Sequence, residues 1–135
     1  MIQSHVGHLV YHIDTKNLAF YKDLLTFLGW SVRYADETGL GMADSNGASL
    51  WFGDPIKPVV NDYDGPGLNH LAIAAASVAD VDAAVDWLKA RGVPALFNTP
   101  CHRPEFSRPG STYYQVMFET PDRLLLEIVY SGTLP

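Results

Sequence analysis

Two histidines and one glutamate occupy segments that otherwise have the apolar composition of β-strands. His8 heads the apolar run in GHLVYHID, His70 heads the run in NHLAIAA, and Glu127 lies inside LLLEIVY. A carboxylate within so apolar a strand is costly to bury unless another group pairs with it. Two imidazoles and one carboxylate form the 2-His-1-carboxylate set, which binds a divalent metal and leaves coordination positions open for a substrate.

Each of these residues also has a simpler explanation when it is taken alone. Both histidines suit ordinary strand positions that hydrogen-bond to the backbone, and Glu127 suits the solvated face of a sheet. The alternation of the first strand places His12 on the same face as His8. His12 is therefore a candidate proton carrier or hydrogen-bond partner of the site, with a polar pocket wall as the alternative.

The strand and helix patterns that position these residues occur twice in the sequence, once in each half. A helical pattern of apolar residues follows each histidine strand and ends at a glycine suited to a left-handed cap, Gly29 and then Gly92. From histidine to glycine is 21 residues in the first half and 22 in the second. This repeat predicts an α+β fold with two βαβββ modules that form a pseudo-twofold, cupped mixed β-sheet with helices on the outside. In that arrangement the two leading strands lie side by side, and His8, His70 and Glu127 face a shared cavity.

The expected boundaries follow from turn signals. A single domain covers residues 1–135, with module one at 1–53, a linker rich in Pro, Gly and Asp at 54–66, and module two at 67–135. Three short strands follow each helix, at 30–35, 39–43 and 48–52 in the first module and at 94–97, 113–119 and 124–130 in the second. Ser77, three residues before Asp80, predicts the N-cap of the second helix. Residues 98–112 predict a long inserted loop, and loops of that length are usually functional or disordered.

The bulk composition indicates a compact soluble protein and excludes several partners. The chain has 135 residues, of which 47% are hydrophobic and 18% charged, with a net charge of −6. An acidic chain offers no basic face to nucleic acid, and no apolar stretch reaches membrane-spanning length. Cys101 is the single cysteine, which rules out an internal disulfide and fits a reducing compartment. The N-terminus has no basic segment ahead of an apolar run, so we expect a cytoplasmic protein.

Two longer motifs enclose the candidate residues, GHLVYHIDTKNLAFYKDLLTFLGW near the start of the chain and FETPDRLLLE near its end. They resemble the opening and closing motifs of the vicinal oxygen chelate superfamily, which includes glyoxalase I, extradiol dioxygenases, fosfomycin-resistance enzymes and bleomycin-binding proteins. The resemblance spans essentially the whole chain, although Thr120 and Arg123 depart from the closing motif's usual Asp and Gly. It implies one divalent metal, Fe, Mn, Zn or Ni, with His8, His70 and Glu127 on three of the four ligand positions. It also implies a homodimer.

Trp51 falls on the fourth ligand position of the superfamily. It lies four residues after the turn residue Gly47, as Glu127 lies four residues after Arg123. Tryptophan does not bind metals, so the remaining set resembles extradiol dioxygenases or fosfomycin-resistance enzymes more than the four-ligand site of glyoxalase I. Trp51 is a candidate wall of the substrate site, with ordinary packing as the alternative.

Further candidate residues belong to the second module. Tyr113, Gln115 and Met117 share a strand face that, by the resemblance, lines the substrate pocket, and Tyr113 is also a candidate proton carrier. In the inserted segment, His102 and Arg103 are candidates for binding an anionic group of the ligand, with simple exposure to solvent as the alternative.

These observations favour a metal-dependent enzyme that acts on a small molecule bound to the metal through two vicinal oxygens. The metal would stabilise the anion that develops during the reaction. The alternative is a metal-free protein that sequesters a cationic aromatic compound, as bleomycin-binding proteins do, and the acidity and aromatic content of the chain suit that role. The intact histidines and glutamate favour the enzyme, whose reaction stays open between ring cleavage with O2 and thiol transfer.

Overall fold

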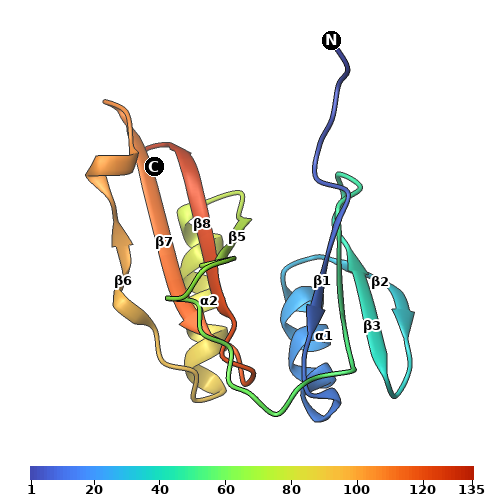
Figure 1. Cartoon of the computed structure of the whole chain (residues 1–135). Helices are drawn as coiled ribbons and strands as arrows, with labels where there is room; N and C mark the ends of the chain where they lie inside the picture. Colours follow the sequence, from blue (N-terminus) through green and yellow to red (C-terminus); the bar gives the residue numbers. More distant parts are fainter. The chain divides into compact units, whose positions relative to one another are not determined.

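The computed structural model describes residues 1–135, which divide into two compact units, Met1–Val59 and Val60–Pro135 (Figure 1). Each unit has the same order of elements: one strand, one helix and three further strands. Each contains a four-stranded mixed sheet with one α-helix against it, so the predicted α+β fold with two βαβββ modules is confirmed. Neither helix is long and apolar enough to cross a membrane.

The first unit is built on a sheet with the strand order β1-β4-β3-β2. Its elements are β1 (His8–His12), η1 (Thr15–Asn17), α1 (Leu18–Phe27), β2 (Ser31–Ala35), β3 (Gly39–Ala43) and β4 (Ser49–Gly53). The first and last strands, β1 and β4, run parallel, and the other pairs are antiparallel. Helix α1 buries Leu24 and Leu25, and its Tyr21 ring stacks on Phe52 at 4.4 Å between centroids. The helix ends before Gly29, whose φ of 86° confirms the predicted left-handed cap.

The second unit repeats this topology with the order β5-β8-β7-β6. Its elements are β5 (Leu71–Ala74), α2 (Val78–Ala90), β6 (Leu96–His102), η2 (Pro104–Phe106), β7 (Ser111–Glu119) and β8 (Leu125–Thr133). Ser77 caps α2 as predicted, because its side chain accepts a hydrogen bond from the Asp80 amide at 3.1 Å. Gly92 follows the helix with a φ of 69°.

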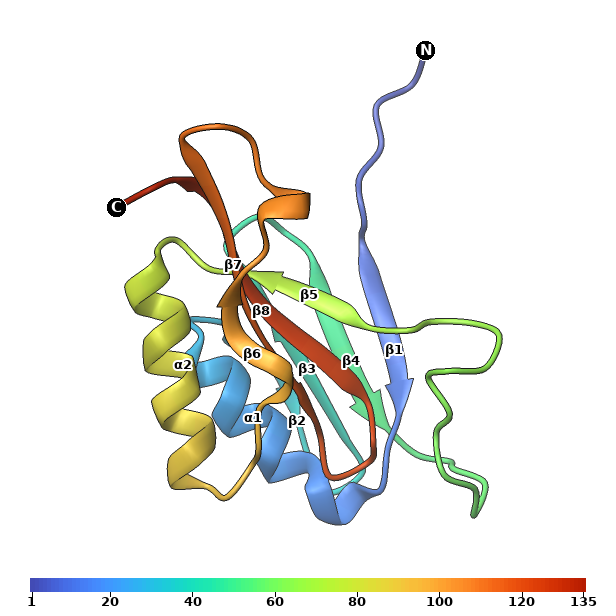
Figure 2. The same ribbon diagram turned by 90° about the vertical axis from the view of Figure 1, so that its left-hand side faces the viewer.

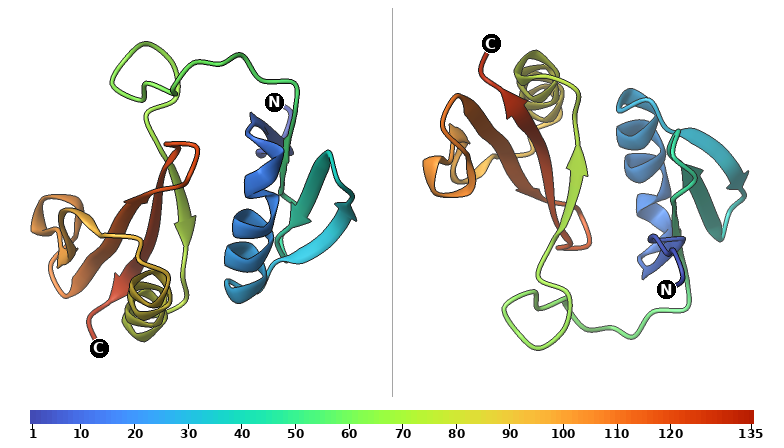
Figure 3. Two further views of the ribbon diagram at one scale, coloured as in Figure 1. Left: turned by 90° about the horizontal axis from the view of Figure 1, so that it is seen from below. Right: turned by 90° about the horizontal axis from the view of Figure 1, so that it is seen from above.

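The two faces of the second sheet have different surroundings. Helix α2 lies along one face (Figures 2 and 3), where the Tyr114 hydroxyl donates to Asp82 of the helix at 2.7 Å. Val116 and Ile128 share that face and are fully buried. The opposite face carries the residues of the other parity, and Glu127 is among them.

The segment predicted as a long inserted loop, 98–112, is more ordered than expected. Strand β6 continues through it to His102, and Pro104–Phe106 forms the short helix η2. The register with β7 shifts between Leu96 and Cys101, and Phe97 and Asn98 both adopt positive φ values, 56° and 58°. This irregularity interrupts the alternation of side chains, and for that reason the sequence pattern predicts a strand only at 94–97 and not its continuation to His102.

Candidate functional site

The buried carboxylate of Glu127 faces the imidazole of His70 in the second unit. Glu127 lies on β8 and is only 2% exposed, whereas His70 immediately precedes β5. The parallel pairing of these strands brings the His70 Nε2 atom to 3.0 Å from the Glu127 Oε2 atom. A buried carboxylate needs such a partner because desolvation penalises an isolated charge.

Asn69 determines which nitrogen of His70 carries a proton. Its Nδ2 group donates to the Tyr63 carbonyl at 2.9 Å, which leaves its Oδ1 atom as an acceptor 2.7 Å from the His70 Nδ1 atom. A carboxamide oxygen only accepts hydrogen bonds, so the Nδ1 atom of His70 must be the donor. In the neutral ring, the Nε2 atom then presents its lone pair to Glu127.

A lone pair facing a carboxylate oxygen at 3.0 Å requires a cation between or on the two groups. Either a proton lies between the Nε2 and Oε2 atoms, or a metal ion binds both atoms. Two atoms bound to one metal at right angles, each about 2.1 Å from it, lie about 3.0 Å apart. The pair therefore fits two neighbouring ligands of a divalent metal, although neither unit by itself gathers three or more His, Cys, Asp or Glu side chains.

Tyr113 completes the hydrogen bonding of the carboxylate. Its hydroxyl, on β7, donates to the Glu127 Oε1 atom at 2.6 Å. Burial, followed by this hydrogen bond and the negative charge of Glu127, raises the pKa of Tyr113 to about 12. The phenol is therefore protonated at neutral pH, and it holds one carboxylate oxygen while the other faces His70.

A short network fastens the segment that carries Asn69 to the turn between β7 and β8. Tyr63 is 7% exposed, and its hydroxyl donates to Glu119 at the end of β7. The guanidinium of Arg123 lies over the Tyr63 ring at 4.7 Å, and Arg123 also exchanges hydrogen bonds with Asn61. These contacts hold the chain ahead of β5 in place, and with it the carbonyl that orients Asn69.

Two further candidates of the second unit, Gln115 and Met117, lie on the same face of the sheet as Glu127. In the antiparallel register, Met117 pairs with Glu127 and Gln115 pairs with Val129, so their side chains share the face of the carboxylate. Gln115 is 4% exposed and accepts a hydrogen bond from Arg103 at 3.0 Å. His102 points elsewhere, because its ring is hydrogen-bonded to the Thr112 hydroxyl.

The corresponding position of the first unit is occupied by Trp51. In that unit Val10 pairs with Trp51, and in the second unit Ala72 pairs with Glu127, each two residues beyond the histidine of its strand. The registers therefore confirm the equivalence that was predicted from the distance to the turn. Indole nitrogen is a hydrogen-bond donor only, and that of Trp51 donates to Ser49 at 3.0 Å.

The histidines of the first unit lie at the two ends of β1. His8 and His12 are both exposed, and they pair with Ser49 and Gly53 of β4. Val10 lies between them on the same face and is 63% exposed. Unlike His70, His8 follows a glycine, so the residue before it offers no side chain to orient its ring.

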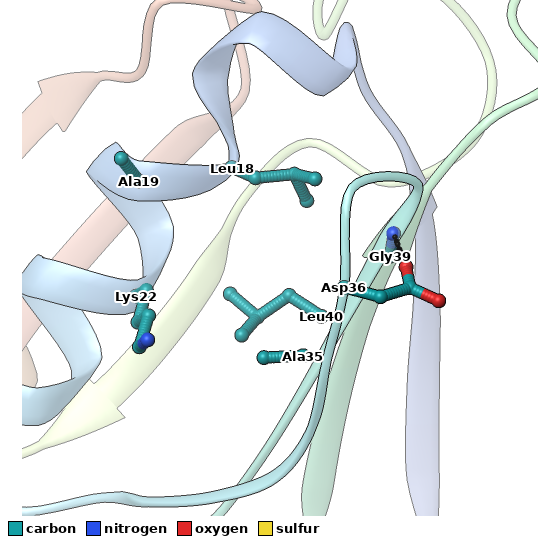
Figure 4. A pocket seen from close by; sticks show the side chains of 7 residues that line it. All are labelled: Leu18, Ala19, Lys22, Ala35, Asp36, Gly39 and Leu40. Carbon is teal, nitrogen blue, oxygen red and sulfur yellow. Dashed lines mark hydrogen bonds between the residues drawn. The ribbon is translucent and has the colours of Figure 1, made fainter.

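A pocket of about 350 Å³ lies elsewhere in the first unit, between α1 and the β2–β3 hairpin (Figure 4). Its lining contains none of the predicted site residues and consists of Leu18, Ala19, Lys22, Ala35, Asp36, Gly39 and Leu40. The Asp36 carboxylate is already engaged by Tyr34, Thr38 and Gly39 in the hairpin turn. This pocket therefore lacks the paired ligands found around Glu127.

Sequence reasoning missed two groups that the structure adds to the site. Asn69 orients His70, and its only signal was a short polar side chain directly before a strand histidine. Phe106, in η2, is 63% exposed and packs edge-on against the Tyr113 ring at 5.4 Å. It belongs to the segment that was predicted as a loop, where no periodicity could assign it a direction.

Comparisons with known protein families and with solved structures point to the same superfamily. A family model described as Glyoxalase/Bleomycin resistance protein/Dioxygenase superfamily matches residues 4–128. Among solved structures, a candidate glyoxalase from Bacillus halodurans is 29% identical with a TM-score of 0.79, covering 95% of this chain and 96% of that one. No curated protein matches the chain.

Two more distant structures share the fold. A glyoxalase/bleomycin resistance protein from Albidiferax ferrireducens T118 is 19% identical with a TM-score of 0.71, covering 94% of this chain and 99% of that one. The fosfomycin resistance protein FosX from Listeria monocytogenes, a mutant solved with Mn(II) and 1S,2S-dihydroxypropylphosphonic acid, is 18% identical with a TM-score of 0.66. That alignment covers 95% of this chain and 90% of FosX.

Proposed function

Since the chain belongs to the glyoxalase/bleomycin resistance protein/dioxygenase superfamily, we propose that it is a metal-dependent enzyme. Its substrate is a small molecule that binds the metal through two neighbouring oxygens. The observation that carries this proposal is the buried Glu127 carboxylate 3.0 Å from a His70 nitrogen whose lone pair points toward it. The Mn(II) bound by FosX supports a divalent metal as the cofactor.

We propose His70 and Glu127 as two metal ligands and His8 as the third. The proposal for His8 rests on the repeat, because it holds the same position relative to Trp51 as His70 holds relative to Glu127. Three protein ligands leave coordination positions that substrate oxygens can take in place of water. Fe, Mn, Zn and Ni all accept imidazole and carboxylate ligands.

The bound metal would supply Lewis-acid stabilisation of negative charge that develops on the substrate. Residues next to the proposed ligands hold His70 and Glu127 in the orientation that metal binding needs. Asn69 holds the His70 ring in the tautomer with a free Nε2 lone pair, and Tyr113 holds the Oε1 atom of Glu127. Tyr113, whose hydroxyl lies against the Glu127 carboxylate, is the proposed proton carrier, with His12 as the second candidate.

The test is the metal content of the untagged protein after anaerobic reconstitution with Fe(II), Mn(II), Ni(II) or Zn(II), measured by mass spectrometry. We expect about one metal per chain, lost in the Glu127→Gln variant and in His70→Ala. Glutamine suits this position structurally, because its oxygen can accept from Tyr113 while its amide donates to His70. The variant therefore removes the ligand charge with little change to the fold.

His8→Ala tests the third ligand, and His5→Ala, in the exposed N-terminal segment, is the matched histidine control that should bind metal normally. A wild-type protein that takes up none of the four metals would contradict the proposal. So would a Glu127→Gln variant that binds metal as tightly as the wild type. In the first case the metal-free sequestering protein becomes the better hypothesis, and in the second the metal binds to residues other than Glu127.

A further inference from the structure

Arg103 is a half-buried cation without an acidic partner. Its Nε group donates to Gln115 at 3.0 Å and its Nη2 group donates to the Phe97 carbonyl at 2.8 Å, and both acceptors are neutral. The ion pairs of the structure involve other residues, so no carboxylate compensates the charge of Arg103. An arginine charge that is partly desolvated and unpaired is available to an external anion.

The two acceptors hold the guanidinium in one orientation. Gln115 is 4% exposed, so its side chain has little freedom to move away from Arg103. Phe97 and the next residue both adopt left-handed backbone conformations, which turn the Phe97 carbonyl toward Arg103. Such conformations are uncommon for residues other than glycine and concentrate at functional sites.

The bonds that hold Arg103 leave most of its donors free. A guanidinium has five N–H groups in a planar fork, and these two contacts use one on Nε and one on Nη2. The Nη1 pair and the second Nη2 hydrogen can form the two parallel hydrogen bonds that a carboxylate or phosphate group accepts. Lysine could not present this planar pair of donors.

The position of Gln115 relates Arg103 to the metal ligands. Gln115 lies two residues before Met117, whose partner across the sheet is Glu127, and the side chains of all three share one face. Two residues of a strand span about 7 Å. A small molecule bound at the carboxylate end of this face can therefore extend to Arg103.

We propose that Arg103, held by Gln115 and the Phe97 carbonyl, binds an oxyanion group of the substrate, a carboxylate or a phosphate-like group. As a statement about the substrate, this inference rests on the proposed function. As a statement about anion binding, it can be tested separately in metal-free protein.

Other arginines of the second unit are engaged differently. Arg91 lies over the Trp87 ring at 3.7 Å, and Arg123 lies over Tyr63. Arg108 is exposed in the loop after η2, which makes it the matched control for the effect of removing one positive charge.

The experiment titrates metal-free, 15N-labelled protein with inorganic phosphate, and separately with acetate, at constant ionic strength. We expect saturable shifts of the Arg103 Nε–H and Gln115 side-chain amide signals with a millimolar Kd for at least one probe. Which probe binds more tightly distinguishes a phosphate-like from a carboxylate group. Arg103→Gln should weaken binding by about tenfold or more, and Arg108→Gln should leave it unchanged.

Gln115→Glu provides a second variant in case Arg103→Gln does not fold. It places a carboxylate where Gln115 already accepts from Arg103, so the fold should persist while the charge is neutralised and anion binding falls about tenfold or more. Absence of saturable shifts in the wild type would overturn the inference. Equal binding by Arg103→Gln or Gln115→Glu, or an equal loss in Arg108→Gln, would also overturn it.

The metal-free Glu127→Gln variant separates this inference from the proposed function. If it binds phosphate or acetate through Arg103 while no form of the protein binds metal, the anion site stands and the metal proposal fails. If the protein binds metal but neither probe shifts Arg103, the metal proposal stands and the anion site fails.

Discussion

The two units share their topology and differ most at one pair of positions. In the first unit Trp51 lies across from Gly41, and a Cβ atom on that glycine would come within 2.5 Å of the indole ring. In the second unit Glu127 takes the place of Trp51, and Met117 takes the place of Gly41. The same position in the sheet thus holds a packed aromatic ring in one unit and a buried acid in the other.

This difference shows that the βαβββ fold does not require an acidic residue at this position. The first unit completes its sheet with an indole that binds no metal, and the second retains a carboxylate whose burial needs both Tyr113 and His70. Burying a charge rarely stabilises a fold as well as an apolar side chain of similar volume does. We infer that Glu127 is retained for its chemistry.

Glu127→Leu should have the largest effect, because it makes the second unit apolar at the position where the first unit has Trp51. We expect metal affinity to fall by more than about 100-fold, since loss of a direct ligand exceeds the 10–100-fold effect of losing an outer partner. Glu127→Leu also leaves the Tyr113 hydroxyl without its acceptor, so stability is compared in Glu127→Leu/Tyr113→Phe, whose free energy of unfolding without metal should stay the same or rise by about 1–2 kcal/mol. Chelator competition measures the first quantity and urea unfolding the second.

Trp51→Leu is the matched control, and it should leave metal affinity unchanged because indole is not a ligand. If Glu127→Leu/Tyr113→Phe instead destabilised the metal-free protein by several kcal/mol, the carboxylate would have a structural role, and the inference about its chemistry would be wrong.

Asn69→Ala should make the start of β5 resemble the start of β1, where Gly7 precedes the histidine. Without the Asn69 acceptor, the His70 Nδ1 proton loses its fixed partner, and metal affinity should fall by about 10–100-fold. The 15N shifts of the His70 ring in metal-free protein measure the tautomer directly. Asn46→Ala, in the exposed turn between β3 and β4, should change neither property, and an unchanged His70 tautomer in Asn69→Ala would refute the assigned role.

The pairing of His70 with Glu127 could be predicted because it depends on rules with little freedom. Side chains alternate along a strand with a period of two, so the apolar strand patterns could assign His70 and Glu127 to one shared cavity. The structure adds that each leading strand pairs with the last strand of its own unit. The count of residues from the turn also correctly placed Trp51 at the position of the first unit that is equivalent to Glu127 in the second. Alternation also puts Gln115 and Met117 on one strand face, which the resemblance implied lines the pocket, and the register shows that this is the face of the carboxylate.

The contacts that make this pair specific could not be predicted. Whether Asn69 reaches His70 depends on side-chain rotamers and on the Tyr63 carbonyl, which belongs to the segment between the units' sheets. The bond between Arg103 and Gln115 depends on the irregular path of β6, where the pairing register shifts. Neither feature has a period that a sequence pattern can reveal.

Gly41→Ala tests the packing of the first unit, with an effect of intermediate size. The added methyl group overlaps the Trp51 ring, and overpacking of this kind costs about 1–3 kcal/mol in the free energy of unfolding. The double variant Gly41→Ala/Trp51→Ala should lose this penalty, because the alanine then occupies the space left by the indole. Gly7→Ala is the control, since its Cβ meets nothing within 4 Å, and an equal penalty with or without the indole would disprove the contact.

Tyr114→Phe should have the smallest effect, and it concerns how each helix is held to its sheet. Helix α1 packs through the stacked rings of Tyr21 and Phe52, whereas α2 is tied to β7 by the hydrogen bond from Tyr114 to Asp82. That bond, together with burial and the charge of Asp82, raises the pKa of Tyr114 to about 12. The variant should lose about 0.5–1.5 kcal/mol of stability at neutral pH.

The pH dependence of this loss follows from the direction in which folding shifts the pKa of Tyr114. The folded pKa of Tyr114, about 12, exceeds the value near 10 expected in the unfolded chain, so folding favours the protonated phenol. The stabilisation is therefore fully present below about pH 10 and disappears as the pH rises toward about 12. Tyr113 titrates in both proteins, so its contribution cancels when wild type and Tyr114→Phe are compared by urea unfolding at about pH 8, 10 and 11. The difference between them should shrink over that range, and a constant difference would mean that the tie to Asp82 does not stabilise the second unit.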